Sequence, residues 1–259
     1  QVTTSALFPE YNTSLYAYFL AQFDKNNKEV GGQGFDYDSW YFGVGKQQSL
    51  DFFGLNPNEL SLRTEVMIQG GRSTARGGTD KETISAFGAL IDVYWLPGDR
   101  FPINLKNVFS YYIGSGDADR FDQHSTAGGN TSGTSDNALN YFGYVATGYA
   151  LAPKLTNLQM LRWNVEARPI NDTHAGWMTS LKVGLSAFLY WKHHHLAPIT
   201  DFTSVEDKRG VGYEIDLYAD LAIASDLDFG IRGGVFVPGN AFEKDDTRNF
   251  FSAYLNFSF

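Results

Sequence analysis

Charged side chains in this chain recur at every second position of otherwise apolar segments, where they can select or bind a solute by charge. In 158–168, for example, Arg162 and Glu166 alternate with large apolar residues. Rings of fixed charge lining a passage decide which ions or sugars enter it. The residues predicted to line such a lumen are Arg63, Glu65, Lys106, Arg162, Glu166, Arg168, Lys182, Glu214, Asp216, Asp220 and Arg232.

The same charges also have a structural interpretation. Opposite charges on neighbouring strands can pair with each other and fill a narrow interior, which would leave little open space in a small barrel. Arg232 belongs to the segment that follows Glu214 and Asp216, so we expect an ion pair between Arg232 and one of these two carboxylates. Both interpretations, an open lumen and a filled one, stay open at this point.

Two clusters could hold a metal ion. Asp117, Asp119 and Asp122 lie within the predicted loop 114–125, and their hard oxygen ligands suit calcium. They lack the glycine and glutamate spacing of an EF-hand loop, so a solvated acidic loop is the alternative, and no other cofactor is expected. The run 193–195 contains three histidines, but consecutive residues of an extended chain point in opposite directions, which predicts an exposed loop rather than a metal site.

Composition excludes several classes of protein. The net charge of −9 over 259 residues excludes a nucleic-acid partner, and the absence of cysteine excludes disulfides. No apolar run approaches the length of a membrane-spanning helix. No nucleophile-elbow motif ties a serine to a histidine, so no enzymatic activity is expected. No secretory leader precedes Gln1, so we expect that a signal peptide, if there was one, has been removed.

Alternation with a period of two predicts an all-β protein, which we interpret as one domain over residues 1–259. A soluble β-sandwich shares this composition, but the last segment ends on Phe259 with one apolar and one polar face, and closing a sheet into a barrel removes its edges. An aromatic residue at the end of the terminal strand is also typical of bacterial outer-membrane barrels. We therefore predict a transmembrane antiparallel β-barrel of about ten strands. The predicted strands are 14–24, 37–47, 59–69, 83–95, 102–113, 158–168, 180–192, 213–223, 228–237 and 249–259.

The predicted loops alternate between long and short, as in outer-membrane barrels. With the terminal strand ending on the periplasmic side, the long loops 114–156, 193–210 and 238–248 face the outside. This pattern requires that 139–152, although partly apolar, does not cross the membrane. We expect it to fold inward or to extend the rim of the barrel.

Particular residues in the C-terminal two thirds of the chain resemble the alginate-export family of outer-membrane barrels. The family has a barrel of about eighteen strands and exports an anionic polysaccharide through a cationic conduit. This chain is shorter, which predicts either a small complete barrel or the C-terminal part of a larger one. Its mixed charges argue against alginate as the solute. The resemblance rests on 212–217 (GYEIDL), 233–242 (GGVFVPGNAF), 115–117 (SGD) and, more weakly, Asn157, Leu161 and Arg162.

The resemblance implies a porin of the Gram-negative outer membrane that lets a polar solute or a saccharide pass by diffusion. The alternative is a plugged barrel that anchors an envelope assembly and binds a partner protein. Outer-membrane lipid and lipopolysaccharide would surround either protein, and no nucleic acid is expected as a partner.

Overall fold

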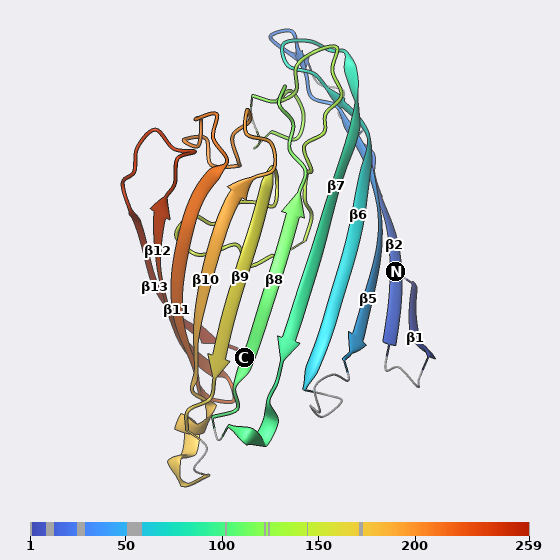
Figure 1. Ribbon diagram of the computed structural model, residues 1–259. Coiled ribbons are helices and arrows are strands. Elements are labelled where there is room, and N and C mark those ends of the chain that lie inside the picture. Colours follow the sequence, from blue (N-terminus) through green and yellow to red (C-terminus); the bar gives the residue numbers. More distant parts are fainter. Residues whose placement is uncertain are drawn as a thin grey trace.

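The main sheet contains eleven strands, and every strand in it is antiparallel to its neighbours (Figure 1). The structure, a computed structural model, describes residues 2–8, 13–24, 29–50, 59–101, 103–121, 123, 125–143, 145–170 and 173–258. The strands of the sheet are β1 (Val2–Phe8), β2 (Thr13–Gln22), β5 (Tyr37–Ser49), β6 (Leu60–Thr74), β7 (Lys81–Trp95), β8 (Lys106–Gly114), β9 (Leu158–Ala167), β10 (Lys182–Lys192), β11 (Gly210–Ala224), β12 (Leu227–Pro238) and β13 (Arg248–Phe257). A small hairpin, β3 (Glu29–Val30) and β4 (Gln33–Gly34), stands apart from it.

All ten predicted strands are present, and β1 is an eleventh that the alternation did not reveal. Each strand pairs with the next in chain order, as expected of successive hairpins. β1 and β13 form the two edges of the sheet, and closure of the sheet into a barrel stays a prediction. Phe259 lies outside the described residues, and the last strand ends at Phe257.

In this sheet charged side chains are buried on one face and apolar side chains are exposed on the other, which is the opposite of the usual arrangement in a soluble protein. On β11, Glu214 and Asp216 are 0% and 1% exposed, whereas Ile215 and Leu217 are 48% and 58% exposed. We call the face that carries Glu214 the inner face and the opposite one the outer face. An outer face of exposed apolar side chains is what contact with lipid requires. Within the described residues, no helix is long and apolar enough to cross a membrane.

The long connection between β8 and β9, residues 115–157, lies against the inner face, and we call it the inner loop (Figure 1). Its described residues form only isolated bridges, so the prediction that 139–152 does not cross as a strand is confirmed. Leu139 and Leu155 are buried, at 0% and 2% exposure. The core of the molecule is therefore the contact between the inner loop and the sheet.

Apolar residues of the inner loop pack into two clusters. One joins Leu151 and Leu155 to Tyr190 and Phe236 of the inner face. The other joins Leu139 to Tyr41 and to smaller side chains of β6 and β7. Burial of these side chains, at about 25 cal/mol per Å² of apolar area, stabilises the inward path of the loop.

The predicted long loops lie at one end of the sheet. The inner loop and the connections β10–β11 and β12–β13 all leave the same end, at the top of Figure 1. The short 3-10 helices η2 (Gly98–Arg100) and η3 (Thr173–Ser180) lie at the opposite end. Which end faces the outside of the cell stays a prediction.

Candidate functional site

The strand register brings the predicted lumen residues of the strands onto one wall. Partners directly opposite each other share a face of a sheet. One such row runs across β6 to β11 through Arg63, Asp92, Ser110, Arg162, Phe188 and Glu214. A second runs across β8 to β12 through Lys106, Glu166, Gly184, Tyr218 and Arg232. Arg168 follows the end of β9 and is exposed.

On the N-terminal part of this wall, carboxylates hold an arginine and several tyrosines. Arg63 lies 3.3 Å from Glu65 and 4.0 Å from Asp92. The hydroxyls of Tyr16 and Tyr18 both donate to Glu65, the second over 2.7 Å. Tyr112 similarly donates to Asp92 over 2.7 Å. The carboxylates are therefore neutralised or hydrogen-bonded within the wall, as buried charges require.

Arg232 pairs with Asp220, and the expected ion pair with Glu214 or Asp216 is wrong. Its Nη2 lies 2.6 Å from Asp220 Oδ1. The register places Arg232 opposite Tyr218, so the guanidinium can reach either Asp216 or Asp220 diagonally. The structure pairs it with Asp220, while Asp216 Oδ2 accepts a backbone hydrogen bond from the inner loop.

Glu214 binds three consecutive backbone amides of the inner loop. The N–H groups of Tyr149 and Ala150 donate to Oε1 over 2.6 and 2.7 Å, and that of Leu151 donates to Oε2 over 3.0 Å. Asp216 Oδ2 accepts a further bond from the Tyr149 amide over 3.0 Å. Successive amides that converge on an anion form a concave nest, and bonds to an ionised acceptor are the strong ones. We call this contact the latch.

The latch depends on a glycine and a tyrosine beside it. Gly148 has φ +100°, and a Cβ at this position would lie 2.5 Å from Glu214 Oε1. Tyr190 donates its hydroxyl to the carbonyl of Thr147 over 2.8 Å, directly before this glycine. Tyr149 stacks on Phe250 of β13, with ring centroids 5.8 Å apart. The sequence does contain a glycine before Tyr149, but nothing in its spacing indicates that Glu214 is the partner.

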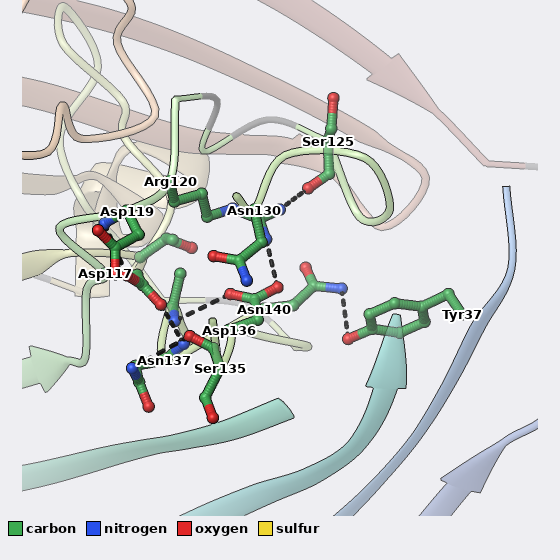
Figure 2. Close-up of polar contacts among 12 residues, drawn as sticks. Tyr37, Asp117, Asp119, Arg120, Ser125, Asn130, Ser135, Asp136, Asn137 and Asn140 are labelled. Atoms are coloured by element: carbon green, nitrogen blue, oxygen red, sulfur yellow. Dashed lines mark hydrogen bonds and ion pairs between the residues drawn. The ribbon is translucent and has the colours of Figure 1, made fainter. Parts of the chain in front are cut away.

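Polar contacts among residues 115–140 hold the base of the inner loop (Figure 2). Asp117 accepts the amides of Asp119 and Asn137 over 2.8 and 2.6 Å. Arg120 pairs with Asp136, and both are buried. Burial raises the pKa of Asp136 although Arg120 opposes that shift. Asn140 then ties the loop to Tyr37 of β5, donating to its hydroxyl over 3.2 Å.

The predicted calcium ligands are not gathered by the part of the chain that the structure describes. Asp117 is buried with both carboxylate oxygens bonded to backbone amides, whereas Asp119 is exposed. Asp122 lies outside the described residues. Across the described residues, no group of three or more acidic or histidine side chains is placed to hold a metal ion. Calcium binding stays a prediction.

The histidine run is half-buried rather than an exposed loop. His193 Nδ1 accepts the amide of Gly116 over 3.2 Å, and burial lowers the pKa of this imidazole. Asn157, at φ +53°, accepts the amide of His194 at its Oδ1 over 2.6 Å. Its Nδ2 donates to the carbonyls of His194, Ala197 and Pro198. Residues 157 and 193–198 thus join the inner loop to the β10–β11 connection.

Three of the predicted lumen cations on the strands make no ion pair among the described residues: Lys106, Arg162 and Lys182. Arg162 lies over the ring of Phe188 at 5.9 Å. Register places Lys106 opposite Glu166 and Lys182 opposite Asp220. Without Arg168, which lies beyond β9, the predicted lumen residues and Asp92 comprise five cations and six carboxylates, so their charges nearly balance.

The sequence from residue 12 to residue 254 matches the family model described as alginate export. The chain belongs to the alginate export family. The match is wider than the C-terminal two thirds that carried the resemblance. Together with the exposed apolar outer face, it makes this member of the alginate export family a porin-like protein of the bacterial outer membrane.

Two solved porin structures resemble this member of the alginate export family. The NanC porin is 10% identical, with a TM-score of 0.39, over 99% of this chain and 96% of that chain. OccK11 (OpdR) of Pseudomonas aeruginosa is 12% identical, with a TM-score of 0.44, over 99% of this chain and 69% of that chain. No curated protein matches the sequence.

Proposed function

We propose that the protein is a passive conduit for polar solutes across the outer membrane. The observation that carries this proposal is the segregation of the strands into an apolar outer face and a charged, tyrosine-rich inner face. Lipid would contact the first and a solute the second. The proposal gives the inner-face carboxylates no catalytic role, because arginines, tyrosines and backbone amides already engage most of them.

The inner loop would set the width of the conduit at one end. It follows the inner face from Ser115 to Asn157 and is held there by the latch. Three of its backbone amides are bound to Glu214, and the buried apolar clusters hold the rest of the loop. Release of the latch would free the segment around residue 149 and widen the passage there without unfolding the sheet.

Conductance of the purified protein in planar lipid bilayers tests the proposal. We expect discrete open-channel currents, and we expect Glu214→Gln to raise the unitary conductance because the neutral amide no longer binds three N–H groups strongly. The exposed Glu243 supplies a matched control, since Glu243→Gln removes the same charge outside the latch. A folded protein that carries no current would contradict the conduit.

The buried clusters beneath the inner loop favour a second candidate function, a plugged barrel that anchors an envelope assembly. Leu139 and Leu158 are 0% exposed, so the loop and the wall pack closely at this end. A plugged barrel would stay silent in the bilayer and would recover currents when the latch is broken. Wild-type currents would argue against the plug.

A further inference from the structure

Four tyrosine rings of the inner face lie flat over glycines of the neighbouring strand. In each pair the tyrosine and the glycine are direct register partners, and a Cβ on the glycine would overlap the phenol ring. A ring that covers a glycine rests on the backbone instead of standing away from the sheet. The pairs are Tyr16 on Gly45, Tyr18 on Gly43, Tyr218 on Gly184 and Tyr254 on Gly230.

Carboxylates fix the hydroxyl end of each ring. Tyr16 and Tyr18 share Glu65 as acceptor, and Tyr218 donates to Glu166 over 3.0 Å. The remaining ring, that of Tyr254, donates to Asp220 over 2.8 Å. Because a glycine supports each ring and a carboxylate holds each hydroxyl, little conformational entropy remains to be lost when a ligand packs on the free face.

The rings are accessible from the interior of the sheet. Tyr254 is 40% exposed and the other three are partly exposed, although Phe142 of the inner loop packs edge-on against Tyr18, with ring centroids 5.9 Å apart. Each group of rings also has an arginine within reach of a ligand: Arg63 beside the β2 pair, and Arg232 between Tyr218 and Tyr254, 5.3 and 5.2 Å from their centroids. An apolar ring face edged by hydrogen-bonding groups suits a pyranose, whose C–H face is apolar and whose rim carries hydroxyls.

Charge distinguishes between classes of sugar. The β2 group contains Arg63 against Glu65 and Asp92, and the other group contains Arg232 against Asp220 and Glu166. The β2 group therefore has one more carboxylate than arginine, whereas Lys106 and Lys182 lie opposite Glu166 and Asp220 in the second group. A uronate would meet like charge at the β2 group, whereas a neutral sugar would meet hydrogen-bond acceptors there.

We propose that the glycine-supported tyrosines 16 and 18 on β2, and 218 and 254 on β11 and β13, form two binding surfaces for neutral pyranosides on the inner wall. The inference deepens the proposed conduit by naming the class of solute, and it rests on that function for its biological role. Binding itself does not require conduction, which allows the two proposals to be tested apart.

The outer face supplies a matched control for the test. Trp40 lies over Gly70 in the same way, with a Cβ on that glycine overlapping the indole, but its side chain faces outward and is 39% exposed. Loss of a glycine-covering ring weakens the sheet on either face. Only the inner rings should affect sugar binding.

The experiment is calorimetric titration of the full protein in detergent micelles with maltohexaose and with an oligogalacturonate of equal length. We expect maltohexaose to bind more tightly than the uronate in low salt. Tyr18→Leu and Tyr254→Leu should each weaken maltohexaose binding about fivefold, the scale of one aromatic contact. Tyr18→Phe and Tyr254→Phe keep the ring and should stay within about twofold. Trp40→Leu should leave binding unchanged.

Absence of maltohexaose binding to the folded wild type would overturn the proposal. So would equal weakening by Trp40→Leu, or tighter binding of the uronate. Currents in bilayers without sugar binding would support the proposed conduit and refute the proposed sugar-binding role of the tyrosines. Sugar binding in micelles, together with the absence of current in bilayers, would support the sugar-binding role of the tyrosines and refute the conduit.

Discussion

At the scale of single residues, the partner of a charged group decides its role. Glu214 and Lys182 are both inner-face residues of alternating strands. The structure uses the first to bind three loop amides and leaves the second without an ion pair among the described side chains. The position of a residue within its strand cannot predict these different roles, because they depend on whether the inner loop packs against the side chain.

Substitution of Gly148 tests the latch at this scale. Gly148→Ala places a methyl group against Glu214 Oε1 and forces alanine into φ +100°, so we expect the inner loop to leave the wall and the unitary conductance to rise. Gly133 has a similar φ of +85°, and a Cβ added there would meet no atom within 4 Å. Gly133→Ala thus reproduces the backbone strain without the clash, and equal effects of the two would contradict the latch.

The His193 contact predicts a response to pH. Burial, together with His194 and Arg209, lowers the pKa of His193, so the folded protein favours the neutral ring that accepts the Gly116 amide. The stability from this group is complete above the ordinary pKa of 6.5 and is lost as pH falls through the lower folded value. Hydrogen exchange at Gly116, corrected for intrinsic rates, should therefore show less protection in acid. His193→Gln keeps an acceptor that does not titrate and should abolish the pH dependence.

At the scale of elements, each strand of a membrane protein of this kind has one face that contacts lipid and one that does not. Leu217 of β11 is 58% exposed on the outer face, and Val205 of the β10–β11 connection is 56% exposed in a loop. Although the two side chains are almost equally exposed, a charge should destabilise the protein only at Leu217 if that residue alone lies in the hydrocarbon of the membrane.

A charge scan of these two positions tests that distinction. Leu217→Arg should destabilise the folded protein in lipid by about 2–4 kcal/mol, the cost of an arginine near the middle of a bilayer. Val205→Arg should change the free energy of unfolding by less than about 0.5 kcal/mol, as is usual for exposed loops. Denaturant titration of protein folded into liposomes measures both, and equal values would place β11 outside the hydrocarbon.

At the scale of the whole molecule, the inner wall is nearly neutral despite its many charges. We expect the wild-type channel to select weakly between small cations and anions, because five predicted lumen cations of the strands face six carboxylates. The double variant Lys106→Gln, Lys182→Gln removes two cations that make no ion pair within the described structure. The reversal potential in a salt gradient should then shift toward cation selectivity, and an unchanged potential would show that these lysines lie off the ion path.

The alternation of residue types by itself determined ten of the eleven strands described and the face on which their charged residues lie, and short motifs indicated the family. Ten segments with a period of two became ten strands, because the pleat fixes alternate side chains on opposite faces whatever the neighbouring strand is. That 139–152 does not cross the membrane could also be inferred, since a further crossing would have broken the alternation of long and short loops, but whether it folds inward or extends the rim could not.

Only the tertiary structure decided which groups meet. The partners of Glu214, Arg232 and His193 depend on strand register and on the path of the inner loop. So do the tyrosines that cover glycines, because Tyr16 and Tyr18 come opposite Gly45 and Gly43 only after β2 has paired with β5. Contacts of this kind join residues far apart in the chain, and local alternation carries no information about them.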